Sequence, residues 1–165
     1  GVYKTKTTVS NAKGIYAFLL KPGTYTIAPV LPGFSFKPVT ARVTVGATRA
    51  RNVWNKTFKR VTRILQPSVA GLRFGQVPVG AFKTMKFSIT NPGTAPVSIA
   101  AFHVPAGFSV VEPAPPVQIA PGARVVVRVR FAPVAAGFVS GVLTMDANQS
   151  SGSDTIAVKG TGIVE

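Results

Sequence analysis

Catalytic chemistry has few candidate side chains in this 165-residue sequence: Glu112, Asp146, Asp154, Glu165 and the single histidine, His103, with no cysteine. Hydrolysis by paired carboxylates needs two acids that converge on one cleft, and none of these acids has a supporting His or Tyr nearby in the sequence. No nucleophile-elbow motif is present for a triad, and one His without Cys excludes a zinc site. The sequence predicts no enzyme, no catalytic residue, no metal and no cofactor.

One predicted loop has residues that could bind a metal ion. Residues 146–154 are acidic and amide-rich, so their oxygens could coordinate Ca²⁺. The segment lacks the spacing and the terminal Glu of an EF-hand. We favour the interpretation as a polar hairpin loop.

Charge is the most unusual property of the chain. Nineteen Lys and Arg face four acids, which gives a net charge of +15. Residues 1–66 hold twelve of the basic residues and no acid, and residues 67–165 hold seven basic residues and all four acids. This imbalance predicts an anionic partner or an acidic neighbour in an assembly, and composition does not choose among nucleic acid, acidic polysaccharide and anionic lipid.

Two segments concentrate this charge. In residues 49–63, cations and the aromatic rings of Trp54 and Phe58 could hold and stack a polyanion, or the segment could be a last strand followed by a solvated basic linker. In residues 124–131, arginines share one face of a predicted strand, either as a contact surface or as a solvated outer face. The candidate contacts to a polyanion or a partner are Arg49, Arg51, Lys56, Lys59, Arg60, Arg63, Arg124, Arg128 and Arg130.

The elements that carry these residues are predicted to be short β-strands. Apolar residues make up 46% of the chain, and 16 glycines and 14 prolines punctuate it without a collagen period. No apolar run approaches the ~20 residues of a membrane span. No signal peptide is visible, and the start at Gly1 leads us to expect a processed chain or a fragment.

The second half alternates cleanly. Apolar residues repeat at every second position in 85–89, 125–131 and 139–145, which predicts strands with one buried and one solvated face. Phe74-Gly75, the turn at residues 90–96, Ala120-Pro121-Gly122, Phe131-Ala132-Pro133 and Gly160-Thr161-Gly162 follow one another in the order of a known family. On these motifs residues 66–164 resemble the immunoglobulin-like domains related to major sperm protein and Hydin, including choice-of-anchor-D repeats. The resemblance implies a scaffolding or interaction role and no shared catalytic residue.

The first half also predicts strands, over 1–9, 15–20, 24–29, 40–45 and 52–58. Its motifs at residues 11–18, 21–27 and 32–38 resemble the transthyretin-like, carboxypeptidase-regulatory-like or Cna-B-like surface domains. Such domains normally begin with two further strands, so we expect residues 1–60 to leave an open sheet edge. Some Cna-B-like domains form Lys–Asn isopeptide bonds, but this segment lacks the assisting acid.

The sequence therefore predicts an all-β chain of two tandem antiparallel β-sandwich domains, the first incomplete at its N-terminus. Residues 1–60 are expected to be a partial transthyretin-like domain, 61–66 a basic linker and 67–165 an Ig-like sandwich. We expect a non-enzymatic structural or adhesive module of an extracytoplasmic bacterial surface protein or fibre. Its open edge would be completed by missing chain or by a neighbouring molecule.

Partners and alternatives follow from the same features. The expected partners are other protein subunits, either in a homopolymer or as acidic chains, and acidic polysaccharide. One alternative function is a carbohydrate-binding accessory module of a secreted enzyme, with a sugar platform formed by Tyr16, Tyr25, Phe34 or Trp54. A third is a non-specific binder of polyanions or nucleic acid.

Overall fold

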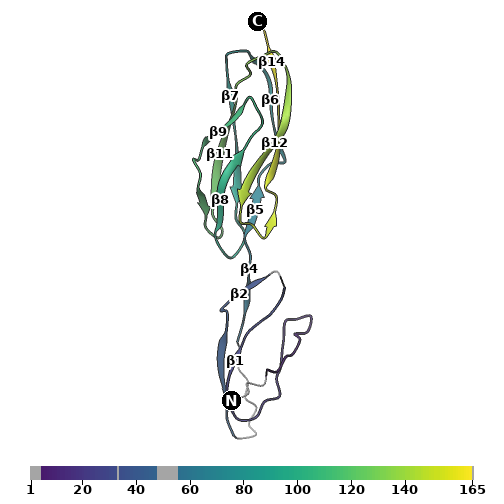
Figure 1. Ribbon diagram of the computed structural model, residues 1–165, viewed down its shortest axis with the longest axis vertical. Coiled ribbons are helices and arrows are strands. Elements are labelled where there is room, and N and C mark those ends of the chain that lie inside the picture. Colours follow the sequence, from purple (N-terminus) through teal and green to yellow (C-terminus); the bar gives the residue numbers. More distant parts are fainter. Residues whose placement is uncertain (1–4, 33, 48–55, 165) are drawn as a thin grey trace. The chain divides into compact units, whose positions relative to one another are not determined.

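The structure is a computed structural model that describes residues 5–32, 34–47 and 56–164. These residues form fourteen β-strands and no helix (Figure 1), which confirms the predicted all-β fold. The chain divides into two compact units, unit 1 (Gly1–Arg60) and unit 2 (Val61–Glu165).

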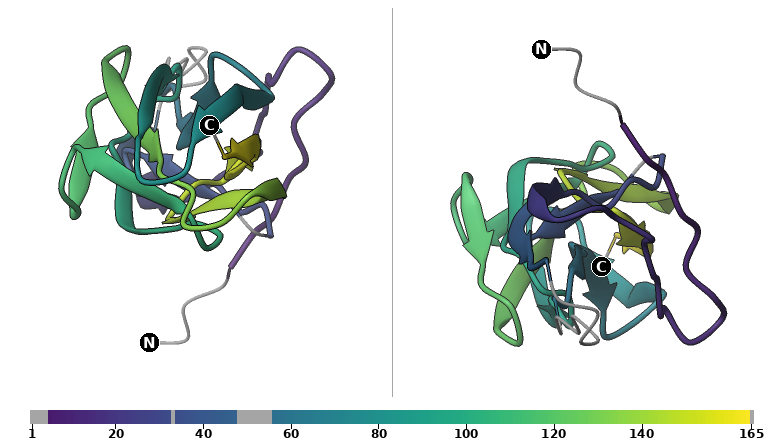
Figure 2. Two further views of the ribbon diagram at one scale, coloured as in Figure 1. Left: turned by 90° about the horizontal axis from the view of Figure 1, so that it is seen from above. Right: turned by 90° about the horizontal axis from the view of Figure 1, so that it is seen from below.

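Unit 2 is a sandwich of two five-stranded sheets. In the first sheet the strands lie in the order β10 (Val117–Ile119), β8 (Val97–His103), β12 (Gly137–Ala147), β14 (Thr155–Ile163) and β6 (Gly71–Pro78). In the second sheet the order is β13 (Ser151–Gly152), β5 (Ile64–Pro67), β7 (Lys83–Thr90), β11 (Arg124–Phe131) and β9 (Phe108–Glu112). Figure 1 shows these strands running up and down the view, and Figure 2 shows the same unit end-on.

The predicted alternation of buried and exposed side chains is confirmed in the strands of unit 2. On β11, Val127, Val129 and Phe131 are buried, whereas Arg124 and Arg128 on the opposite face are exposed. β7 and β12 bury alternate apolar side chains in the same way. Since a strand turns successive side chains to opposite faces, each sheet contributes one apolar face to a shared core.

Three phenylalanine rings occupy one part of this core. The ring centroids of Phe74 and Phe108 lie 5.4 Å apart, and Phe131 stacks on Phe108 at 4.7 Å. The Phe131 ring fits against β14 because position 160 is glycine, where a Cβ would collide with it. Aromatic pairs of this kind stabilise a core beyond the area that they bury.

The side chain of Asn91 is the one polar side chain that is fully buried among the described residues of unit 2. Its Oδ1 accepts hydrogen bonds from the backbone N–H groups of Ile64 (3.2 Å) and Gly93 (3.0 Å). Its Nδ2 donates to the carbonyl oxygens of Ala95 (2.8 Å) and Ile119 (3.0 Å). Because Ile64 is in β5 and Ile119 in β10, this one amide ties the two sheets together at one end of the sandwich.

The segment expected as a linker, residues 61–66, includes most of strand β5 instead. The Thr62 backbone N–H donates to Thr94 Oγ1 (2.9 Å), and the Arg63 backbone N–H donates to Ser150 Oγ (2.8 Å). Two residues further on, Leu65 is fully buried in the core. The basic composition of this stretch predicted a solvated linker. Instead, its backbone groups form hydrogen bonds with two loops, and Leu65 packs into the core.

Unit 1 is much less regular. Its strands are β1 (Gly23–Ile27) paired with β3 (Ala41–Val45), and β2 (Ser35–Lys37) paired with β4 (Lys59–Val61). The predicted strands over 24–29 and 40–45 correspond to β1 and β3, whose Tyr25 and Val43 face each other in antiparallel register.

Two other strand predictions in unit 1 were wrong for the described residues. Residues 5–9 and 15–20 have no regular secondary structure, and both figures draw residues 5–20 as a plain tube. A turn closed by the Gly14 N–H and the Asn11 carbonyl (2.8 Å) joins the two segments. The pattern of residues 15–20 suits a strand, but a ladder also needs a neighbouring strand, and none of the described residues supplies one. The strand predicted over 52–58 lies mostly outside the described residues.

We expect Asn91→Ala to lower the free energy of unfolding of the full chain by about 2–4 kcal/mol, because it leaves several buried backbone groups without hydrogen-bond partners. Urea denaturation followed by far-UV circular dichroism measures this change.

Asn148→Ala is the matched control. The Asn148 side chain also caps a strand, accepting from the Ser98 N–H at 2.9 Å, but it is exposed. We expect that variant to lose at most about 1 kcal/mol. Equal losses in the two variants would show that burial of the Asn91 amide is not what stabilises this end of the sandwich.

Candidate interaction surfaces

The most regular charged feature is the arginine row, which consists of Arg124, Arg128 and Arg130 on the outward face of β11. β11 pairs with β7 along its whole length and with β9 from Arg128 to Phe131, so its backbone is held on both sides at Arg128 and Arg130 and on one side at Arg124. Residues two apart on a strand are about 6.7 Å apart, so the row extends over about 20 Å. The structure brings together these three predicted contact residues.

Each arginine of the row has a different neighbourhood. Arg128 lies opposite Lys86 of β7 and also opposite Glu112 of β9. Its Nε is 3.0 Å from Glu112 Oε2, in an ion pair whose side chains are 53% and 65% exposed. Such an exposed pair contributes little to stability, about 0–1 kcal/mol.

Arg130 is held by an aromatic ring. Its guanidinium carbon lies 4.6 Å from the centroid of the Phe82 ring, in a cation–π contact. Its Nε is buried and has no hydrogen-bond partner among the described residues. Arg124, at the other end of the row, is exposed and lies opposite Thr90.

The other predicted basic contacts lie in or beside unit 1. Arg49 and Arg51 lie outside the described residues. Lys56, Lys59 and Arg60 are exposed, and the Arg60 guanidinium lies 4.6 Å from the centroid of the Phe34 ring.

Arg63 belongs to unit 2 and is half-buried. Its backbone N–H and carbonyl are both bonded to the Ser150 hydroxyl, at 2.8 and 3.0 Å. The backbone of Arg63 therefore helps to fix the start of the sandwich.

The four aromatic residues considered as a sugar platform do not form one open surface. Tyr16 and Tyr25 are half-buried, and their hydroxyls donate to the carbonyl oxygens of Lys56 and Lys21, each at 2.8 Å. Phe34 is covered on one side by a guanidinium. Trp54 lies outside the described residues.

The loop at residues 146–154 uses its polar groups within the fold. The Asn148 side chain accepts from the Ser98 N–H at 2.9 Å, and Gln149 Nε2 donates to Asp154 Oδ2 at 3.1 Å. Among the described residues no group of three or more His, Cys, Asp or Glu is placed to hold a metal ion. His103 is exposed near the end of β8.

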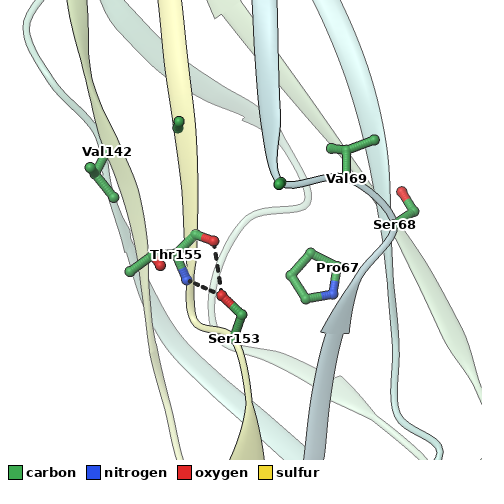
Figure 3. A pocket seen from close by; sticks show the side chains of 8 residues that line it. Pro67, Ser68, Val69, Val142, Ser153 and Thr155 are labelled. Atoms are coloured by element: carbon green, nitrogen blue, oxygen red, sulfur yellow. Dashed lines mark hydrogen bonds between the residues drawn. The ribbon is translucent and has the colours of Figure 1, made fainter.

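A groove of about 550 Å³ lies beside the connection from β5 to β6 (Figure 3). Its lining is apolar or hydroxylic: Pro67, Ser68, Val69, Ala70, Val142, Ser153, Thr155 and Ala157. The Ser153 hydroxyl is bonded to the backbone of Thr155 (Figure 3). The groove offers no charged group for acid–base or metal chemistry.

Sequence reasoning missed three residues that shape the arginine row: Phe82, Lys86 and Glu112. Phe82 immediately precedes β7, and the other two become neighbours of Arg128 only through the register of β11 with β7 and β9. These strands are not consecutive in the chain, so no local signal in the sequence fixes that register. In the described part of the chain there is also no helix able to cross a membrane.

Solved structures resemble this chain in fold. The ASH/PapD-like domain 7 of human CEP192 is 13% identical, with a TM-score of 0.52 over 72% of this chain and 97% of that domain. A protein of unknown function from Porphyromonas gingivalis W83 is also 13% identical, with a TM-score of 0.52 over 89% of this chain and 88% of its own. The VesB protease of Vibrio cholerae has a TM-score of 0.46 over 59% of this chain and 31% of its own, at 18% identity. No protein of curated function matches the sequence significantly.

A family profile matches at the level of sequence. The profile "ASH: Abnormal spindle-like microcephaly-assoc'd, ASPM-SPD-2-Hydin" covers residues 61–155, which is more than half of the chain. This confirms the resemblance of the second half to Hydin-type domains and extends it into the segment expected as a linker. The resemblance of residues 1–60 to transthyretin-like domains stays a prediction. The chain belongs to the ASH family, whose domains are non-catalytic Ig-like modules that often mediate protein interactions.

Proposed function

We propose that the chain is a structural or adhesive module of an extracytoplasmic bacterial surface protein or fibre, and that unit 1 engages its partner by pairing with an additional β-strand. The strand comes from outside the described residues, from a neighbouring molecule or another part of the same polypeptide. ASH membership supports an interaction role for unit 2. The proposal for unit 1 depends on residues 15–20.

Residues 15–20 are an unbroken apolar run, Ile-Tyr-Ala-Phe-Leu-Leu. Such runs are typical of strands that are covered on both faces. Here one face is partly covered, since the ring of Tyr16 lies 6.2 Å from that of Phe18 and 6.3 Å from that of Phe58. The other face is open, with Ile15 63% and Leu19 92% exposed. This exposed apolar segment is the observation that carries the proposal.

The sheets of unit 1 also lack support. Among its described apolar residues only Val43 and Val45 are buried, whereas unit 2 has a continuous core. Two-stranded sheets such as β1–β3 are marginally stable in water unless further strands or a packed layer are added. Strand addition would supply main-chain hydrogen bonds and cover the exposed side chains at the same time. The transthyretin-like character proposed for residues 1–60 fits this need.

Charge favours an acidic partner. Residues 1–66 carry twelve cations and no acid, so a second copy of unit 1 would bring like charge to the contact. Repulsion of this kind acts within about 8 Å at physiological ionic strength. We infer that the completing strand carries acidic residues, or that a polyanion lies between adjacent copies of the basic unit.

The carbohydrate-binding alternative has less support. A sugar platform needs open aromatic faces, and the described candidates are partly buried or covered. Tyr16 and Tyr25 use their hydroxyls inside unit 1, and Phe34 lies under Arg60. The arginine row on unit 2 is a separate surface, which would bind a ligand through charge and not through ring stacking.

In the native particle, we expect the backbone amides of residues 16–20 to exchange with solvent at least roughly a hundredfold more slowly than in the isolated chain, since strand pairing would bond them. Hydrogen exchange read by mass spectrometry measures this. We expect Ala17→Pro to abolish the protection and the assembly seen by electron microscopy, because proline removes a ladder donor. Thermal unfolding of unit 2 should be unchanged.

Ala12→Pro is the matched control. Ala12 follows Asn11 in the turn closed by the Gly14 N–H, a position where proline fits the backbone. We expect this variant to assemble like the wild type. Fast exchange of residues 16–20 in the native particle, or normal assembly of Ala17→Pro, would contradict strand pairing.

A further inference from the structure

We propose that the arginine row of unit 2 binds a linear polysaccharide that carries carboxylate groups. The guanidinium groups of Arg124, Arg128 and Arg130 would hold the carboxylates, and neighbouring hydroxyls would bond the sugars. This site lies on the second sheet of unit 2 and does not depend on the strand pairing proposed for unit 1.

At the Arg130 end of the row, the guanidinium is already oriented for binding a carboxylate. Stacking on Phe82 restricts the Arg130 guanidinium, whose buried Nε has no hydrogen-bond partner among the described residues. A planar guanidinium held in this way presents its N–H fork for bidentate bonding to a carboxylate, which a lysine could not do. Arg130 therefore loses little side-chain freedom when it binds.

At the centre of the row, a bound anion would reduce the repulsion between Arg128 and Lys86. Arg128 lies directly opposite Lys86 on β7, and like charges opposite each other across a sheet destabilise it. Glu112 offsets this from the other side through an exposed ion pair with Arg128. A bound carboxylate would relieve the repulsion and would compete with Glu112 for Arg128.

The length of the row indicates a polymer. Arg124 and Arg130 are six residues apart on one strand, about 20 Å. One small anion cannot contact both ends, so a ligand that uses the whole row has to be extended and repeatedly charged.

The side chains between the cations favour a sugar over a protein or a nucleic acid. Hydroxyl groups adjoin the row: Thr84 and Ser109 lie opposite Arg130, and Thr90 lies opposite Arg124. The outward apolar residue of β11 is Val126, 44% exposed, which is a small anchor for a protein interface. Single-stranded nucleic acid stacks successive bases on aromatic rings. Phe82 is 62% exposed, but it is a single ring, and the Arg130 guanidinium covers one side of it.

A triple substitution tests the site in the full chain, with polygalacturonate as the probe and titration calorimetry at physiological ionic strength as the measurement. Arg124→Ser, Arg128→Ser and Arg130→Ser together lower the net charge from +15 to +12. We expect the affinity to fall on the order of tenfold or more, since charge-assisted hydrogen bonds are lost.

The control triple removes the same charge from outside the row: Lys13→Ser in unit 1, and Arg73→Ser and Lys159→Ser on the first sheet of unit 2, all at exposed positions. We expect its affinity to fall less than about threefold, because exposed charges that do not touch the ligand attract it only through screened electrostatics. Equal losses in the two triples would overturn the site in favour of general electrostatic attraction. Tighter row-dependent binding of polyglutamate or oligothymidylate than of polygalacturonate would overturn the assignment to a polysaccharide.

A gain of affinity gives a second test that a folding defect cannot imitate. Glu112→Gln frees Arg128 from its ion pair, so we expect polygalacturonate to bind about two- to fivefold more tightly. Asp146→Asn is the control, because it makes the same change in net charge, to +16, at an exposed position on the other sheet. An equal gain in both variants, or none in Glu112→Gln, would contradict the competition between Glu112 and the ligand.

Discussion

The buried amide of Asn91 is the interaction on which the sandwich of unit 2 most depends. A buried amide has two donors and two acceptor sites to satisfy, and here each side of it serves two backbone groups. Those groups belong to strands of both sheets and to the turn between β7 and β8. Any shift of one sheet along the other would break several of these bonds at once, so the amide specifies the relative placement of the sheets as well as contributing stability.

The surfaces of unit 2 follow from that placement. With the sheets held in position, β11 presents its arginines outward on a backbone that β7 bonds along its whole length, and β9 brings Glu112 beside Arg128. Unit 1 differs because it has no comparable buried polar hub or continuous core among its described residues. Unit 2 has a packed core, whereas unit 1, which carries most of the basic residues, leaves apolar side chains such as Leu19 exposed.

Alternating patterns in unit 2 were readable from the sequence, since a period of two with valines and phenylalanines on one side leaves few alternatives to a sandwich strand. The part played by Asn91 was not readable. Its Asn-Pro-Gly context indicates a turn, and nothing local reveals that Ile64 and Ile119 converge on it. Likewise, residues 15–20 have strand-like side chains, but pairing depends on a neighbour that local composition does not describe. Register between distant strands, which places Lys86 and Glu112 beside Arg128, is decided by the packed sheets.

The hydrogen bonds that hold Thr62 and Arg63, just before β5, affect how unit 2 carries mechanical load. β5 begins at one end of the sandwich and β14 finishes at the other, as Figure 1 shows for this unit. Tension along the polypeptide would therefore pull these two strands in opposite directions, parallel to their own axes. The ladder bonds, which lie across the strands, would be loaded together in shear and would not open one after another. The bonds of Thr62 and Arg63 to the neighbouring loops would take up the first part of that force.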